Sequence, residues 1–241
     1  MAELLVPLCR RKTTNPYENP RFIAAFPDGL RPGGLELTKE ALDFCSFAPG
    51  SFLVDLGCGT GVTLDFLKKS GFKVFGLDKS DKLLDSARLK GEVQKASFES
   101  LPLEDKVADG LFCECVFSLA QDKFQALKEI RRVLKTGGFF IISDLFPKKP
   151  LDSEPDNKPT PEPGTCAAGA VSLHHLENLL ITAGFTVKYY KDHEKALKSL
   201  AARLVWEYGS LANLAKLWSG DAVGCLGGRN LTYGLVVAQA V

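Results

Sequence analysis

The chain has 241 residues, a formal net charge of +1 and 45% hydrophobic residues, which suits one domain with a sizeable core. So small a net charge provides no strong field for nucleic acid, and no stretch reaches the roughly twenty apolar residues of a membrane-spanning helix. The seven cysteines include no paired C-x-x-C array, so we expect no bound metal. Met1–Leu8 has no basic leader, so we expect a cytoplasmic protein. We expect it to bind neither membrane nor nucleic acid.

Residues 1–48 form the first predicted segment, which is irregular at its start and helical over Leu37–Phe47. Arg31-Pro32-Gly33-Gly34 predicts a turn just ahead of that helix.

A largely apolar run, Leu53–Leu56, leads into Gly57-Cys58-Gly59-Thr60-Gly61 and then into a predicted helix over Val62–Lys69. The run has the character of a parallel strand buried on both faces. Glycine permits a tight turn and lets a ligand lie against the main chain, while the helix N-terminus offers free backbone amides. This segment therefore predicts a site for an anionic or carboxylate-bearing ligand.

The spacing of the glycines argues against a dinucleotide. In the dinucleotide fingerprint G-x-G-x-x-G the third glycine comes one residue later than Gly61, at the position that Val62 occupies here. Asp55, two places before Gly57, would repel a pyrophosphate but can accept a hydrogen bond from an ammonium group. The pattern acidic-x-Gly-x-Gly-x-Gly resembles the cofactor loop of class I S-adenosylmethionine-dependent methyltransferases.

Lys73–Asp78 predicts a second short strand that ends in a carboxylate, roughly twenty residues after Gly57. An acid at this separation hydrogen-bonds ribose hydroxyls in dinucleotide-binding folds, and we expect the same of Asp78. The alternative is that Asp78 only caps a helix starting near Ser80. The glycine turn favours the ribose role.

The chain then alternates strand and helix up to Leu145, which predicts parallel strands joined by right-handed crossovers. Ala108–Cys113 and Phe139–Ile142 are the fourth and fifth predicted strands, with Gly137-Gly138 as a helix stop before the fifth. Residues 146–170 are rich in proline and predict a mobile loop or lid, with an inert exposed linker as the alternative.

The last part of the chain predicts a helix over Leu173–Thr182, a strand over Phe185–Tyr190 and a longer helix from Asp192 to about Leu217. Leu231–Ala240 predicts a closing strand. Trp206, on the long helix, has two possible roles, as part of a core stripe or as a wall of a substrate pocket.

The order of these elements also resembles class I methyltransferases, strongly over residues 30–145 and by architecture beyond. The resemblance implies a single-domain, Rossmann-like α/β fold with a doubly wound, mostly parallel seven-stranded sheet, helices on both faces and the last strand inserted antiparallel. It also implies an N-terminal arm, 1–48, folding over the cofactor site, and a methyltransferase domain, 49–241. Arg31 would then approach the methionine end of the cofactor, with a plain turn as the alternative.

The resemblance implies S-adenosyl-L-methionine as cofactor and S-adenosyl-L-homocysteine as product. Asp55 would lie beside the methionine moiety, Asp78 would bind the ribose, and Lys79 would cover the adenine. Ser97 stands where many relatives place an acid for the adenine amino group. The expected cofactor residues are Asp55, Gly57, Gly59, Thr60, Gly61, Asp78, Lys79, Ser97, Phe98 and Cys113.

Cys113-Glu114-Cys115 ends the fourth strand, where the family brings acceptor and methyl group together. Alternation along a strand predicts that the two cysteines share a face with Glu114 opposed, although simple burial of both thiols is the alternative. Glu114, Cys113, Cys115 and Asp144 are the candidate catalytic residues. The absence here of the Asn/Asp-Pro-Pro-aromatic sequence counts against nucleic-acid amino groups as acceptors.

We therefore expect a methyltransferase of the bacterial small-molecule type, a monomer or weak homodimer, that moves a methyl group to a small molecule by in-line displacement. Arsenite methyltransferases share this cofactor fold and bind their metalloid through cysteine thiolates, so Cys113 and Cys166 raise a thiol or metalloid acceptor such as arsenite as an option. Two alternatives are a non-catalytic, cofactor-binding partner subunit and a nucleotide-dependent oxidoreductase.

Overall fold

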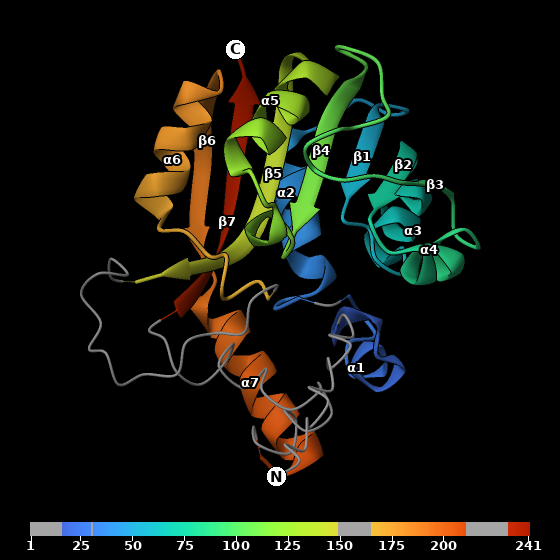
Figure 1. Ribbon diagram of the computed structural model, residues 1–241, viewed down its shortest axis with the longest axis vertical. Coiled ribbons are helices and arrows are strands. Elements are labelled where there is room, and N and C mark those ends of the chain that lie inside the picture. Colours follow the sequence, from blue (N-terminus) through green and yellow to red (C-terminus); the bar gives the residue numbers. More distant parts are fainter. Residues whose placement is uncertain (1–15, 30, 149–164, 211–230) are drawn as a thin grey trace, which may run out of the picture.

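The computed structural model describes residues 16–29, 31–148, 165–210 and 231–241 (Figure 1). The strands are β1 (Phe52–Leu56), β2 (Lys73–Asp78), β3 (Glu92–Lys95), β4 (Ala108–Glu114), β5 (Leu134–Pro147), β6 (Phe185–Asp192) and β7 (Leu231–Ala240). The α-helices are α1 (Pro20–Ala24), α2 (Leu35–Cys45), α3 (Val62–Lys69), α4 (Asp81–Ala87), α5 (Lys123–Val133), α6 (Leu173–Thr182) and α7 (Glu194–Tyr208), and the short 3₁₀ helices are η1 (Pro16–Glu18) and η2 (Phe117–Leu119).

The strands form one seven-stranded sheet in the order β3-β2-β1-β4-β5-β7-β6. β7 runs antiparallel to both of its neighbours, whereas the other described pairings are parallel. This confirms the predicted doubly wound sheet with an inserted last strand. The chain order reverses between β1 and β4, and in open α/β sheets a ligand crevice lies at the carboxyl ends of the strands at such a point.

Alternation along the central strands divides the core between the two faces of the sheet. Val54 and Leu111 point into a cluster that includes Ile130 of α5, while the adjacent residues Leu53 and Phe112 point into a cluster with residues of α2 and α3. Because both faces are covered, β1 and β4 are apolar at successive positions. The sheet is thereby held rigidly beneath the crevice.

A separate apolar cluster lies around the carboxyl ends of β4 and β5 and includes residues of β5 and β7. It joins the N-terminal segment, residues after position 164 and α7, which extends away from the sheet in Figure 1. Its buried members are Ala25, Phe26, Leu37, Cys115, Leu145, Ala167, Ala170, Leu204 and Tyr233. Segments far apart in the sequence therefore meet above the end of the sheet.

Two predictions about helix ends are wrong. α7 ends at Tyr208 rather than near Leu217, because Gly209 takes a left-handed conformation at φ 78° and its N–H bonds the Val205 carbonyl. The N-terminal helix also ends early, at Cys45, because Ser46 takes a left-handed conformation.

Trp206 of α7 is 89% exposed and so belongs neither to a core stripe nor to a pocket wall.

The glycine pair after α5 has another function than the predicted helix stop. α5 already ends at Val133, and Gly137, at φ 81°, lies inside β5. The pairing with β4 shifts there, since Ala108 faces Leu134 while Gly110 faces Phe139. Gly137 therefore accommodates an irregularity in the strand.

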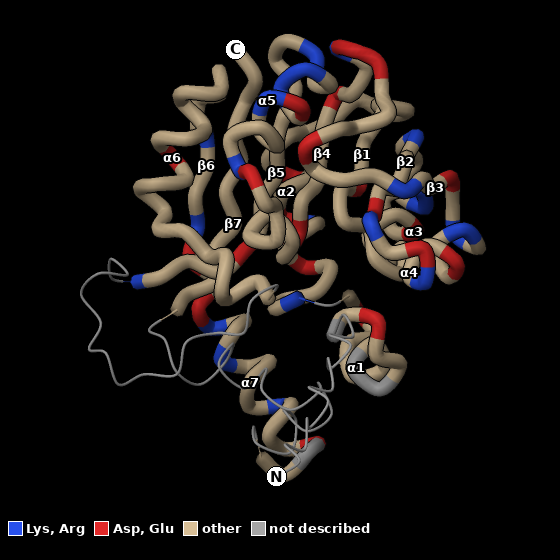
Figure 2. The backbone as a smooth tube through the Cα atoms, in the orientation of Figure 1, with Lys and Arg blue, Asp and Glu red and all other residues tan. Residues whose placement is uncertain are grey.

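The proline-rich segment is described only at its two ends. β5 continues to Pro147, and residues 149–164, which carry most of the predicted loop or lid, lie outside the described residues, as do Cys9 and Cys225. Acidic and basic residues are interspersed along the described chain (Figure 2). Among the helices in the described ranges, none has the length and apolar character needed to cross a membrane.

Candidate functional site

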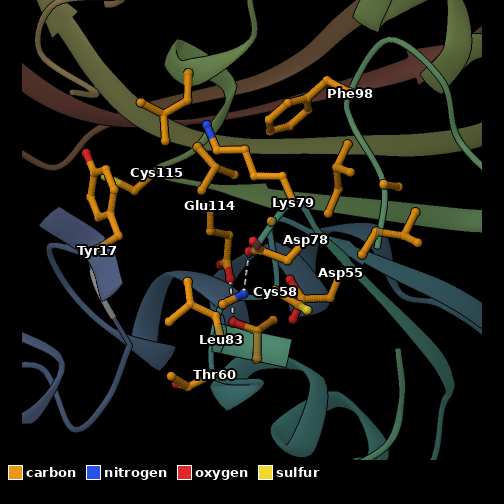
Figure 3. Close-up of a pocket in the computed structure, with 18 of the residues that line it drawn as sticks. Tyr17, Asp55, Cys58, Thr60, Asp78, Lys79, Leu83, Phe98, Glu114 and Cys115 are labelled. Atoms are coloured by element: carbon orange, nitrogen blue, oxygen red, sulfur yellow. Dashed lines mark hydrogen bonds between the residues drawn. The ribbon is translucent and has the colours of Figure 1, made fainter. Parts of the chain in front are cut away.

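A pocket opens at the carboxyl ends of β1, β2 and β4, where the strand order reverses (Figure 3). Of the ten residues expected to contact a cofactor, all but Gly61 and Cys113 line it. The N-terminal segment contributes Tyr17, Gly29 and Arg31. The sheet, the turn after β1 and the chain ahead of α2 thus build one cavity.

The glycines of the turn after β1 meet different surroundings. A Cβ atom on Gly57 would lie 2.7 Å from the side chain of Val116, so the turn packs closely against the chain beyond β4. A Cβ on Gly59, at φ 53°, would meet nothing within 4 Å, so its main chain faces open space in the pocket. Gly61 does not line the pocket, since its α-carbon faces Ala87 of α4.

Asp78 ties the end of β2 to the glycine turn. Its Oδ2 accepts the Gly59 N–H at 2.9 Å and its Oδ1 accepts the Ser80 N–H at 2.8 Å. The hydroxyl of Ser80, and not Asp78, caps α4 by accepting the Leu83 N–H. Burial raises the pKa of Asp78, and these two bonds oppose that shift. A carboxylate has further lone pairs, so Asp78 can also accept from hydroxyl groups in the pocket.

Asp55 is the unsatisfied carboxyl group of the site. It is 3% exposed, and its Oδ2 is the buried side-chain polar atom without a hydrogen-bond partner among the described residues. Burial, together with the nearby Glu114, raises the pKa of Asp55 to about 8, against the attraction of Arg31. Since a buried polar atom without a partner is costly, this position calls for a donor from a ligand.

Glu114 ends β4 within a buried network rather than as an available base. Its Oε1 accepts the Thr38 hydroxyl at 2.8 Å, and its Oε2 accepts the Thr63 hydroxyl at 2.7 Å and lies 3.0 Å from Nη2 of Arg31. Arg31 also donates to Thr38 Oγ1 at 2.8 Å and to the Gly34 carbonyl at 3.2 Å. The turn ahead of α2 thereby fixes a guanidinium at the pocket wall.

Apolar side chains also line the pocket. They are Leu83, Ala96 and Phe98, and Lys79 and Ser97 line it as well. Figure 3 shows Lys79 and Phe98 at the same end of the pocket, away from Thr60. Glu99 also lines the pocket, although its Oε1 already accepts the backbone N–H groups of residues 121 and 122.

The two cysteines around Glu114 do not share a face. Cys113 is fully buried in the core cluster beneath α5 and does not line the pocket. β4 ends at Glu114, and Cys115 has φ 60°, so strand alternation no longer applies there. Cys115 lines the pocket and packs in the cluster around the strand ends.

Asp144 is buried but lies away from the pocket lining. Its carboxylate accepts the Ser118 N–H at 2.9 Å, the Ser118 hydroxyl at 3.1 Å and the Leu145 N–H at 2.7 Å. Burial raises its pKa to about 6, with these bonds opposing the shift. Its contacts anchor the chain after β4 to the end of β5.

Tyr17 and Cys166 are residues of the site that the sequence patterns did not single out together. The Tyr17 hydroxyl accepts the Cys166 N–H at 3.1 Å, and the thiols of Cys115 and Cys166 are hydrogen-bonded to each other. In Figure 3, Tyr17 and Cys115 stand next to one another at one end of the pocket. Their sequence separation is large, so no local pattern could have revealed this contact.

Residues 54–142 match the family described as "Methyltransferase domain". An arsenite methyltransferase of Halobacterium salinarum is 30% identical over 154 residues, which cover 59% of this chain. The chain spans only 39% of that relative's own length.

Solved structures share the fold at low sequence identity. The [4+2]-cyclase SpnF superposes with a TM-score of 0.73 at 19% identity, over 95% of this chain and 93% of that one. Phosphoethanolamine N-methyltransferase 2 of Haemonchus contortus, in complex with phosphomonomethylethanolamine and S-adenosylhomocysteine, has a TM-score of 0.71 at 18% identity, over 90% of this chain and 56% of that one. The glycine turn, the sheet order and the matched domain agree with the predicted class I S-adenosylmethionine-dependent methyltransferase.

Proposed function

We propose that this chain is an enzyme that binds S-adenosylmethionine and transfers its methyl group to a small-molecule acceptor by in-line displacement. The observation that carries the proposal is the unpartnered Oδ2 of Asp55 in the same pocket as Asp78 and the open face of Gly59. An adenosyl amino acid offers an ammonium group to the Asp55 oxygen and ribose hydroxyls to the Asp78 carboxylate. Its flat base would lie in the same pocket.

The donor set fits the cofactor from end to end. Asp55 would accept from the ammonium group, and Arg31 would donate to the carboxylate, since both line the pocket and the charge of Arg31 acts on Asp55. Asp78 would hold the ribose hydroxyls, while Phe98 and the stem of Lys79 would cover the adenine. When bound, the cofactor supplies an electrophilic sulfonium methyl group.

The residues of the chain would act by position rather than by strong base catalysis. Glu114 has both oxygens engaged by Arg31, Thr38 and Thr63, so we assign it the role of holding Arg31 in place. Asp144 and Cys113 lie outside the pocket lining and would not touch the reacting atoms. Orientation and exclusion of water would then supply most of the rate enhancement.

We also propose that residues 1–48 act as an arm over the cofactor and that residues 49–241 form the methyltransferase domain. Tyr17 and Arg31 reach the pocket from that arm, and the Ser80 hydroxyl donates to Glu18 at 2.8 Å. The arm is thereby attached to the N-terminus of α4. Binding of the cofactor would bury it between arm and sheet.

For the acceptor we propose a small molecule, handled in the cytoplasm by a monomer or weak homodimer. The similarity to an arsenite methyltransferase supports a thiol or a metalloid as one candidate acceptor. The [4+2]-cyclase has a similar fold but is named for a different reaction, and a shared fold does not imply a shared reaction. This supports the alternative of a cofactor-binding protein without methyl transfer. An oxidoreductase is the weakest alternative, given the spacing of the glycines.

Calorimetric titration with S-adenosylmethionine, S-adenosylhomocysteine and NADH tests the proposal. We expect saturable binding of the first two and none of NADH, and formation of S-adenosylhomocysteine when a cell extract supplies acceptors. Asp78→Asn should abolish both signals, whereas Asp85→Asn, an exposed acid on α4 paired with Arg88, should leave them unchanged. Binding of NADH alone would overturn the proposal, and cofactor binding with no turnover across extracts would favour the non-catalytic alternative.

A further inference from the structure

The described cysteines divide into three isolated thiols and one pair. Cys45, Cys58 and Cys113 are each buried, and burial is the leading cause that raises the pKa of their thiols. Cys115 and Cys166 are hydrogen-bonded through their side chains, 51 positions apart in the sequence. This pair stands at the end of the cofactor pocket, where Cys115 forms part of the wall.

Three segments hold the pair together. The Cys115 N–H bonds the Ser143 carbonyl at 2.6 Å, which fixes the end of β4 to β5. The Cys166 N–H bonds the Tyr17 hydroxyl at 3.1 Å, which fixes the chain after position 164 to the N-terminal arm. The next residue, Ala167, is fully buried in the same cluster as Cys115. The two thiols are therefore positioned by tertiary contacts on both sides.

The surroundings lower the pKa of one thiol of the pair relative to the other. The pKa of Cys166 is lowered because its sulfur accepts hydrogen bonds from the Cys115 thiol and from Tyr17, against burial and the charge of Asp144. The pKa of Cys115 is raised, since it gives its proton to that bond and is buried. A thiolate is the nucleophilic and ligating form of cysteine, and a lowered pKa makes that form easier to reach at Cys166.

The number of donors limits which ligand the pair can take. Structural zinc needs four ligands, and the described residues contain no group of three or more His, Cys, Asp or Glu side chains able to hold a metal ion. Thiolates are soft donors and select soft, thiophilic centres. A trivalent metalloid can be held by two of them.

We propose that Cys115 and Cys166 form a two-thiol site for trivalent arsenic or a like metalloid, placed at the acceptor end of the pocket. This rests on the proposed function, because only a methyltransferase would use a metalloid there as acceptor. With arsenous acid, two arsenic–oxygen bonds break and two arsenic–sulfur bonds form. Each thiol proton leaves with a hydroxyl group as water, and nothing is oxidised or reduced. The site contains Cys115 and Cys166 but not Cys113, which the sequence also raised as a candidate and which lies in the core.

The test uses the full chain in its reduced form, with arsenite as the probe, measured by native mass spectrometry. We expect one arsenic per chain. Cys115→Ser and Cys166→Ser should each weaken binding by more than about tenfold, at least the loss seen when a supporting residue of a metal site is removed. Cys45→Ser, a buried thiol at the end of α2, is the control and should bind as the unsubstituted chain does.

A second measurement does not depend on variants. Bound arsenite should protect Cys115 and Cys166 of the unsubstituted chain from alkylation, as mapped by peptide mass spectrometry. Unchanged affinity in both serine variants, protection of other cysteines, or recovery of the pair as a disulfide that binds no arsenite would each overturn the site. Titration with S-adenosylmethionine separates the two proposals: lost cofactor binding in the unsubstituted chain contradicts the methyltransferase, whereas lost arsenite binding alone contradicts only the thiol site.

Discussion

The backbone N–H of Gly59 donates to Oδ2 of Asp78 over 2.9 Å, which joins the turn after β1 to the end of β2. The same contact sets one edge of the pocket, because Gly59 has open space where a side chain would stand. The carboxylate expected to bind a ribose thus also orders the turn beneath it. Site and fold are coupled at this point.

Replacing Gly59 by alanine should block the cofactor while leaving the fold intact. The added methyl group would enter the open space of the pocket, and the left-handed backbone would cost roughly 1 kcal/mol of stability. Gly50→Ala is the control, since Gly50 has φ 78° and also nothing within 4 Å of its Cβ position, but lies outside the pocket. Thermal melts should fall similarly in both variants, and calorimetry should find weakened S-adenosylmethionine binding only in Gly59→Ala. Equal binding by the two would contradict the proposed site.

Asp55→Asn should stabilise the protein without ligand at neutral pH. The pKa of this carboxyl is raised to about 8, so between an ordinary aspartate value and 8 the folded state holds a proton that the unfolded state has lost. Stability should therefore fall as pH rises through that window, by up to about 1.4 kcal/mol per pH unit from this group. The variant should lose this slope in melts between pH 5 and pH 8. Asp85→Asn, at an exposed position, should keep it.

Binding of S-adenosylmethionine should tighten as pH rises toward about 8. The ammonium group needs an ionised Asp55, and the carboxyl without ligand is largely protonated below that pH. Binding should then release a proton, which calorimetry in two buffers of different ionisation enthalpy would detect. Asp55→Asn should bind weakly at every pH. A proton release that survives in the variant would assign it to another group.

Glu114→Gln should destabilise the protein strongly. Arg31 is buried with Glu114 at 3.0 Å, and the variant leaves its charge without a compensating anion, at a cost of about 3–5 kcal/mol. Glu36→Gln removes one partner of an exposed pair with Lys39 at 2.6 Å and should cost about 0–1 kcal/mol. Denaturant unfolding measures both. A loss below that of the exposed pair would contradict the role of Glu114 in holding Arg31.

Local patterns were enough for most of the secondary structure. The bounds of α3, β2, α6 and β7 agree with the sequence prediction, because apolar periodicity, glycines and the serine before α6 all act within a few residues. The glycine register also excluded a dinucleotide loop without reference to distant residues. These features depend on the neighbouring chain alone.

Contacts between distant segments could not be predicted in this way. Cys113 and Cys115 were expected on one face because alternation holds within a strand, but the strand ends between them and Cys115 has φ 60°. The apolar pattern of the sequence predicts a helix to about Leu217, but α7 ends at Tyr208 because Gly209 forms a left-handed cap.

By itself the sequence determined the class of fold and the cofactor loop, since strand, turn and carboxylate follow one another along the chain. Only the tertiary structure decided that Arg31 joins Glu114, that Asp55 keeps an unpartnered oxygen, and that Cys115 meets Cys166 beside Tyr17. Those relationships depend on burial and on groups brought together from separate segments, which sequence spacing does not record.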